Sequence, residues 1–107
     1  VIMDRNYIQI DGMTEDVMPL ETLADKYRAF NWQVIEVDGN DMAAVVEALV
    51  QSKQNKANPT LILANVVPGK GVSFVESDYV WHGKPPTKDE LAKGLVELTA
   101  LRATLCQ

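Results

Sequence analysis

The feature that most constrains the fold is an apolar run enclosed by two prolines. Pro59 and Pro68 bound residues 60–67, and six of these eight residues are Leu, Ile, Ala or Val. A run of this length between two breakers is typical of a strand buried on both faces, as in parallel sheets. Parallel strands need a crossover connection, usually a helix, so strands and helices should alternate along the rest of the chain.

The segments around this run show that alternation. Short apolar or alternating segments predict strands at residues 1–3, 7–10 and 33–37. Apolar residues at helical spacing predict helices over about 19–30, 42–52 and 87–105. The resulting order predicts an α/β fold with a mostly parallel sheet, right-handed crossovers and flanking helices.

Local signals mark the ends of the first two predicted helices. Pro19 is expected at the first position of the first helix, where its missing N–H costs nothing. Asn31 is expected in a left-handed conformation just after that helix. Asn40 or Asp41 is expected to cap the second helix by accepting a free backbone N–H.

The later part of the chain combines apolar helix faces with one long loop. The second predicted helix has an amphipathic stripe of Met42, Val45, Val46, Leu49 and Val50. The third has a stripe, interpreted as core or subunit interface, of Leu91, Leu95, Leu98, Leu101 and Leu105. Thr87 with Glu90 forms a capping box for this helix. Residues 68–87 lack periodicity, and loops of this length in compact proteins are usually functional or disordered.

Composition excludes several classes of function. Ten Lys and Arg against fifteen Asp and Glu give a net charge of −5, so we expect no nucleic-acid binding. No apolar run approaches the roughly 20 residues of a membrane span, so no membrane partner is expected. The single cysteine, Cys106, cannot form an internal disulfide, and Cys and His are too few for a zinc site. These features together favour a cytoplasmic protein.

Candidate site residues follow the ends of the predicted strands, where parallel sheets bind their ligands. Asn6 follows the first strand, and its amide oxygen together with the carbonyl of Ile8 would suit Mg²⁺ or Ca²⁺. The alternative for Asn6 is a turn former without a ligand. His82 is the only histidine and lies in the long loop. It either exchanges protons and donates to phosphate or is an ordinary exposed loop residue.

A second candidate in the long loop is the turn Gly69-Lys70-Gly71. Its backbone N–H groups and its cation could approach a phosphate. The alternative is a glycine turn without such a role, because the segment is not a Walker motif.

Several runs occur together in one order. They are Asp4-Arg5-Asn6-Tyr7-Ile8-Gln9-Ile10-Asp11-Gly12, Val34-Ile35-Glu36-Val37-Asp38-Gly39, Gly69-Lys70-Gly71-Val72-Ser73-Phe74 and Trp81-His82-Gly83-Lys84-Pro85. The first resembles the end of the thiamine diphosphate motif of transketolases, and the resemblance continues over nearly the whole chain. It is greatest to the separate N-terminal subunit of split bacterial transketolases, whose diphosphate-binding domain is a parallel α/β layer.

The resemblance implies a role for four residues. Asn6 would offer its side-chain oxygen, and Ile8 its backbone carbonyl, to the Mg²⁺ or Ca²⁺ that holds the diphosphate of thiamine diphosphate. Ile10 would pack near the thiazolium ring. His82 would hydrogen-bond the diphosphate or assist proton transfer on the donor sugar. The metal has a physical role, because it joins two negative phosphates to an acidic protein.

The sequence also departs from the family's pattern. The Gly-Asp-Gly that opens the motif, with its charged metal ligand, is not in this sequence, nor are the histidines of the substrate channel. The glutamate that activates the aminopyrimidine belongs to a different domain. Pro68 stands where many relatives have Lys, which removes a cation and an N–H from that position.

These observations predict that residues 1–107 are the carboxyl-terminal portion of a transketolase-like diphosphate-binding domain. The opening Val1-Ile2-Met3 has the character of a strand inside a longer protein. The whole enzyme would move a two-carbon ketol unit from a ketose phosphate to an aldose phosphate. It would act with a C-terminal subunit or a pyrimidine-binding domain, in a homo- or hetero-oligomer. The alternatives are a ketolase like 1-deoxy-xylulose-5-phosphate synthase and a non-catalytic α/β module that binds a partner protein.

Overall fold

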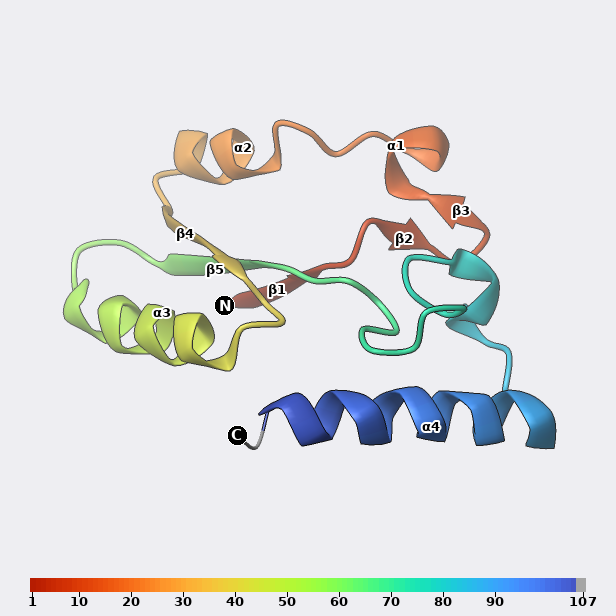
Figure 1. Ribbon diagram of the computed structural model, residues 1–107. Helices are drawn as coiled ribbons and strands as arrows, with labels where there is room; N and C mark the ends of the chain where they lie inside the picture. The colour runs from red at the N-terminus through yellow and green to blue at the C-terminus, as the bar shows by residue number, and fades with distance from the viewer. Residues whose placement is uncertain (106–107) are drawn as a thin grey trace.

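A parallel three-stranded sheet forms the centre of the molecule. In the computed structural model, which describes residues 1–105, the strand order is β1 (Ile2–Arg5), β5 (Thr60–Asn65) and β4 (Gln33–Asp38). Helix α2 (Leu23–Ala29) covers one face of the sheet and helix α3 (Met42–Gln54) the other (Figure 1). The predicted α/β architecture is therefore confirmed.

Strand β5 is buried on both faces, as its composition predicts. Leu61, Ile62, Leu63 and Ala64 are at most 7% exposed, because β5 is the central strand and α2 and α3 cover the two faces of the sheet. Leu61 and Leu63 point to the same face and pack with Leu23 of α2 in the hydrophobic core.

A small antiparallel hairpin follows β1. Strands β2 (Ile8–Gln9) and β3 (Gly12–Met13) pair with each other, and helix α1 (Thr14–Val17) comes directly after them. The predicted strand at 7–10 is therefore shorter than expected, and neither β3 nor α1 was predicted. After β5, the long loop contains one 3₁₀ helix, η1 (Tyr79–His82), before helix α4 (Lys88–Leu105).

The first predicted helix begins later than expected. It starts at Leu23, so the prediction that Pro19 occupies its first position is wrong. The reason is a polar anchor: the Glu21 carboxylate accepts both from the Arg5 guanidinium and from the Leu23 N–H. This anchor holds the segment before Leu23 outside the helix. Asn31 has φ 64°, as predicted for the residue after the helix.

The other predicted caps are present. The Asp41 side chain accepts from the backbone N–H groups of Ala43 and Ala44 at the start of α3. At the start of α4, Thr87 and Glu90 each accept the other's backbone N–H, at 2.7 and 3.3 Å.

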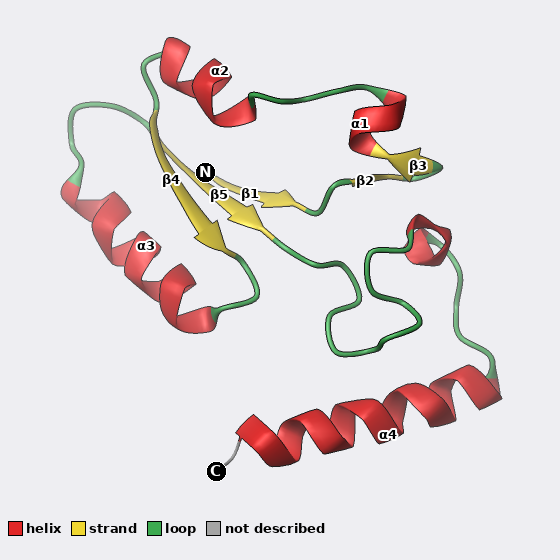
Figure 2. Ribbon diagram, turned by 45° about the horizontal axis from the view of Figure 1, so that its top comes forward, coloured by secondary structure: helices red, strands yellow, loops and turns green. Residues whose placement is uncertain are grey.

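The molecule is flat and leaves much apolar surface open. Its extents are 51 × 39 × 16 Å, and its radius of gyration of 16.7 Å exceeds the roughly 13 Å of a compact chain of this length. Figure 2 shows α4 set apart from the sheet and joined to it through the long loop. All five leucines of the α4 stripe are at least 40% exposed. Within residues 1–105 they are not core, so the subunit-interface alternative remains a prediction.

The α3 stripe is also only partly buried. Met42, Val46 and Val50 are more than half exposed, whereas Ala48 is the residue that α3 buries. A sheet of three strands offers α3 a narrow surface, so the helix rests on a small residue and leaves one side of its stripe open. Cys106 lies outside the described residues.

Candidate functional site

The carboxyl ends of β1 and β5 lie side by side and bring the predicted site residues together. Arg5 pairs with Asn65, so Asn6 leaves the sheet beside the start of the long loop. A cavity of about 120 Å³ is lined by Asn6, Ile8, Pro68, Gly69, Val75, Asp78, Trp81 and His82. We call it the small cavity. Three of the four predicted site residues, Asn6, Ile8 and His82, therefore share one space.

Asn6 forms the turn that its alternative interpretation predicts. Its side-chain oxygen accepts the backbone N–H of Ile8 at 2.9 Å, and the residue is half-buried. Tyr7, between the two, has φ 62°. An amide oxygen has two lone pairs, so this hydrogen bond leaves one available for a further partner.

His82 lies at the end of η1 and lines the small cavity together with Asn6 and Ile8. It is exposed, and it also lines a neighbouring cavity of about 400 Å³. Ile10 lines that second cavity and not the small one. His82 therefore belongs to both cavities, the first shared with Asn6 and the second with Ile10.

Three residues of the small cavity, Val75, Asp78 and Trp81, were given no role from the sequence. The Asp78 carboxylate caps η1 by accepting the backbone N–H of Val80 at 3.0 Å. Trp81 packs edge-on against Phe74, with the ring centres 5.6 Å apart, and the Lys84 ammonium lies 4.0 Å from its ring centre. Trp81 belongs to the run Trp81-His82-Gly83-Lys84-Pro85 that carries the resemblance, whereas Asp78 and Val75 have no such signal, because Asp and Val are common in long loops.

The turn Gly69-Lys70-Gly71 fits the alternative interpretation, a glycine turn that does not bind phosphate. The Gly71 N–H donates to Glu76 at 2.8 Å and the Lys70 N–H to the Val67 carbonyl at 3.2 Å. Lys70 itself is exposed and does not line the small cavity. Two backbone donors that a phosphate would need are thus engaged within the loop. Gly69 is different, because it lines the cavity with φ +74°.

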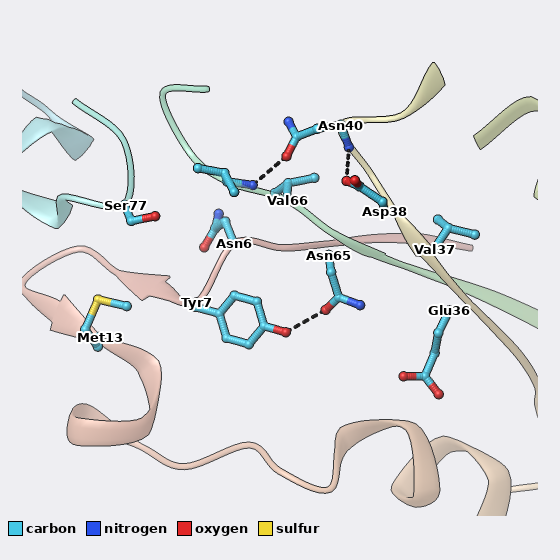
Figure 3. A pocket seen from close by; sticks show the side chains of 11 residues that line it. Asn6, Tyr7, Met13, Glu36, Val37, Asp38, Asn40, Asn65, Val66 and Ser77 are labelled. Atoms are coloured by element: carbon cyan, nitrogen blue, oxygen red, sulfur yellow. Dashed lines mark hydrogen bonds between the residues drawn. The ribbon is translucent and has the colours of Figure 1, made fainter. Parts of the chain in front are cut away.

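A larger open cavity adjoins the small one at Asn6. It has a volume of about 530 Å³ and lies over the carboxyl ends of β4 and β5 (Figure 3). Its polar groups bond to one another: the Tyr7 hydroxyl donates to Asn65 and the Val67 N–H to Asn40, both at 2.7 Å. Asn6 lies at the border and lines both cavities.

Arg5, directly before Asn6, is a buried charge with three side-chain partners. It is 4% exposed and donates to Thr14 at 2.8 Å, to Glu15 at 2.8 Å and to Glu21 at 2.7 Å. Burial acts to lower the pKa of Arg5, but the hydrogen bonds to Glu21 and Glu15 outweigh it and raise this pKa. The Arg5 hydrogen bond in turn lowers the pKa of Glu21. The site's first strand is therefore tied to α1 and to the segment before α2.

The sequence of this chain matches a known protein family and several curated relatives. Residues 1–99 match the family model described as transketolase, thiamine diphosphate binding domain. The chain belongs to the transketolase family. It is 40% identical over 95 residues to a 6-deoxy-6-sulfo-D-fructose transketolase subunit of Clostridium sp., covering 89% of this chain and 34% of that protein. It is 35% identical over 98 residues to an apulose-4-phosphate transketolase subunit of Phocaeicola vulgatus, covering 92% and 35%.

Solved transketolase structures share the fold of this chain. The transketolase of Leishmania mexicana superposes with a TM-score of 0.77 at 33% identity, over 87% of this chain and 14% of that one. The transketolase of Campylobacter jejuni gives a TM-score of 0.76 at 27% identity, with the same coverage. This transketolase chain spans about a third of the length of the two curated relatives.

The residues of the small cavity fit one end of the family's cofactor. A volume of about 120 Å³ is well below the roughly 300–1,000 Å³ of pockets that enclose a whole small-molecule ligand, so the cavity suits part of a cofactor only. Amide and carbonyl oxygens suit a hard divalent cation, and an imidazole suits a phosphate oxygen. Within residues 1–105 no three His, Cys, Asp or Glu side chains gather as a metal site, and the small cavity has only Asp78 and His82 of these residue types. In the same range no helix has the length and hydropathy needed to cross a membrane.

Proposed function

We propose that this chain forms the carboxyl-terminal portion of the thiamine-diphosphate-binding domain of a transketolase. The whole enzyme transfers a two-carbon ketol unit from a ketose phosphate to an aldose phosphate. The observation that carries the proposal is the convergence of Asn6, Ile8 and His82 on one small cavity beyond the carboxyl ends of the sheet. Such edges are where α/β sheets bind phosphorylated ligands.

Each residue has a distinct part in holding the cofactor. The Asn6 side-chain oxygen and the Ile8 carbonyl would hold Mg²⁺ or Ca²⁺, whose charge would offset part of the negative charge of the diphosphate. His82 would donate to a diphosphate oxygen or move a proton on the donor sugar. Ile10, which lines the neighbouring cavity with His82, would offer an apolar surface to the thiazolium. Thiamine diphosphate, when bound, supplies the electron sink for cleaving the carbon–carbon bond, and the protein orients the reactants.

The proposal includes a partner for this chain. Its relatives include proteins named as subunits of transketolases, and this chain spans about a third of each of the two described above. The sugar phosphates meet the cofactor where this domain faces a C-terminal subunit or a pyrimidine-binding domain. Isothermal titration of the 107-residue chain alone should therefore show no tight thiamine diphosphate binding. Tight binding would contradict the view that this chain is one portion of the site.

The test separates cofactor retention from turnover in the native enzyme that contains this chain. Asn6→Ala should weaken thiamine diphosphate binding in the presence of Mg²⁺ by at least about tenfold, because a metal ligand is lost. His82→Ala should chiefly lower kcat. Asn58→Ala is the matched control, since Asn58 precedes β5 at the opposite end of the sheet. Equal affinity in the wild type and the Asn6 variant would remove the metal role from the proposal.

A further inference from the structure

The residue before Asn6 is anchored in several elements at once. One terminal nitrogen of Arg5 donates to Thr14 of α1, and the other donates to Glu15 and Glu21. The Arg5 carbonyl also accepts the Val66 N–H after β5, at 3.1 Å. A guanidinium with two carboxylate partners keeps its charge and fixes its plane, so Arg5 cannot turn without breaking these bonds.

The residue after Asn6 is held just as firmly. Tyr7 has φ 62°, a conformation that residues with a side chain avoid unless the surroundings impose it. The Arg5 guanidinium carbon lies 4.1 Å from the centre of the Tyr7 ring, and the Tyr7 hydroxyl donates to Asn65 at 2.7 Å (Figure 3). The Tyr7 carbonyl accepts the Thr14 N–H at 2.8 Å. Three contacts from different elements thus impose the unusual backbone.

With both neighbours fixed, the turn between them has one shape. The Asn6 oxygen is directed to the Ile8 N–H, and both residues line the small cavity. When the protein groups of a site are already ordered, binding does not lose free energy to ordering them. We infer that Arg5 and Tyr7 are positioning residues, which hold the Asn6–Ile8 turn in the shape that receives the metal and the diphosphate. This inference rests on the proposed function.

The chain offers a matched control for the arginine. Arg28 also donates to two carboxylates, Asp25 and Glu36, at 2.8 Å each. Its side chain is 49% exposed on α2, and its bonds do not involve the Asn6–Ile8 turn. Lys keeps the positive charge of Arg but lacks the planar guanidinium. Arg5→Lys and Arg28→Lys therefore make the same chemical change, the first beside the Asn6–Ile8 turn and the second on α2.

The experiment titrates Ca²⁺ into the native enzyme at a fixed concentration of thiamine diphosphate. Isothermal titration records the heat released as Ca²⁺ is added, which gives the Ca²⁺ concentration for half-saturation. The value of kcat is measured separately, at saturating Ca²⁺ and cofactor. Arg5→Lys should raise the Ca²⁺ concentration for half-saturation about tenfold, and Tyr7→Phe about threefold through loss of one hydrogen bond. Arg28→Lys should leave it unchanged. At saturating Ca²⁺ and cofactor, kcat should stay within about twofold of the wild type in every variant, because excess ligand restores the occupied turn.

The outcomes separate this inference from the proposed function. An unchanged Ca²⁺ requirement in Tyr7→Phe, with only the melting temperature lowered, would make the contacts purely structural and overturn the inference. The Tyr7 variant decides the matter even where Arg5→Lys does not fold. A wild type that binds thiamine diphosphate equally with and without Ca²⁺ would instead remove the metal role from the proposed function. Faster hydrogen exchange of the Ile8 amide in Tyr7→Phe, relative to Arg28→Lys, is the supporting result without any ligand.

Discussion

Two glycines near the small cavity differ sharply in what a side chain would meet. Gly69 has φ +74°, and a Cβ there would lie 2.5 Å from Cγ1 and 3.1 Å from the carbonyl carbon of Val75. Gly83 follows His82 with φ −128°, and a Cβ there would meet nothing within 4 Å. Alanine at residue 69 therefore meets both an unfavourable backbone and a crowded wall of the cavity, whereas at residue 83 it meets neither.

The magnitude follows from these two costs. A left-handed backbone costs a residue with a side chain roughly 1–2 kcal/mol, and overpacking roughly 1–3 kcal/mol. The Val75 methyl can rotate away, but its main-chain carbon cannot. We therefore expect Gly69→Ala to lower the free energy of unfolding by about 2–5 kcal/mol and Gly83→Ala to change it by less than about 1 kcal/mol.

Urea unfolding of the native protein, followed by tryptophan fluorescence, measures this difference, and Trp81 reports from the same cavity. Thiamine diphosphate affinity should fall in Gly69→Ala and persist in Gly83→Ala, because only the first change shifts a wall of the small cavity. Equal urea midpoints and equal cofactor affinities in Gly69→Ala and Gly83→Ala would contradict this reasoning.

Two further predictions concern packing and pH. Leu61→Ala, at a fully buried position, should cost about 3–5 kcal/mol by urea unfolding, and Leu49→Ala, at a half-buried position, about 1–2 kcal/mol; the reverse order would contradict the burial that the structure shows. The Thr87 N–H, the Lys84 ammonium and the Thr87 hydroxyl lower the pKa of Glu90 from its usual 4.5 to about 2. This carboxylate therefore stabilises the start of α4 fully above pH 4.5, and the contribution disappears as the pH falls towards 2. Far-ultraviolet circular dichroism should show helix lost over that range in the wild type and not in Glu90→Gln, and equal pH profiles would contradict the assignment.

The parts of the fold that the sequence predicted are those with strong local signals. The apolar run between Pro59 and Pro68 predicted a strand buried on both faces, and the burial of β5 confirms this prediction. The caps Asp41 and Thr87 act within a few residues of themselves, so their geometry does not depend on distant parts of the chain. The same holds for Asn31, whose left-handed backbone follows from the end of one helix.

The parts that the sequence did not predict depend on partners far along the chain. The start of α2 moved because Glu21 bonds to Arg5, 16 residues earlier. Periodicity favours a helix from Pro19, and no local signal records a competing ion pair. The apolar stripes of α3 and α4 were recognised as stripes, but their exposure depends on how much surface a three-stranded sheet offers, which periodicity does not encode.

The candidate site shows why local and functional interpretations of one residue need not compete. Asn6 was either a turn former or a metal ligand, and the structure gives it the turn, with one lone pair directed to Ile8. That turn fixes where the second lone pair points, so the local role is the condition for the proposed one. The two interpretations of His82, an exposed loop residue and a group that acts on the substrate, are also compatible. An exposed imidazole that lines two cavities is accessible to a substrate, whereas a buried one would not be. The hydrogen bond that identifies Asn6 as a turn former is therefore compatible with the metal role that we propose for the same oxygen.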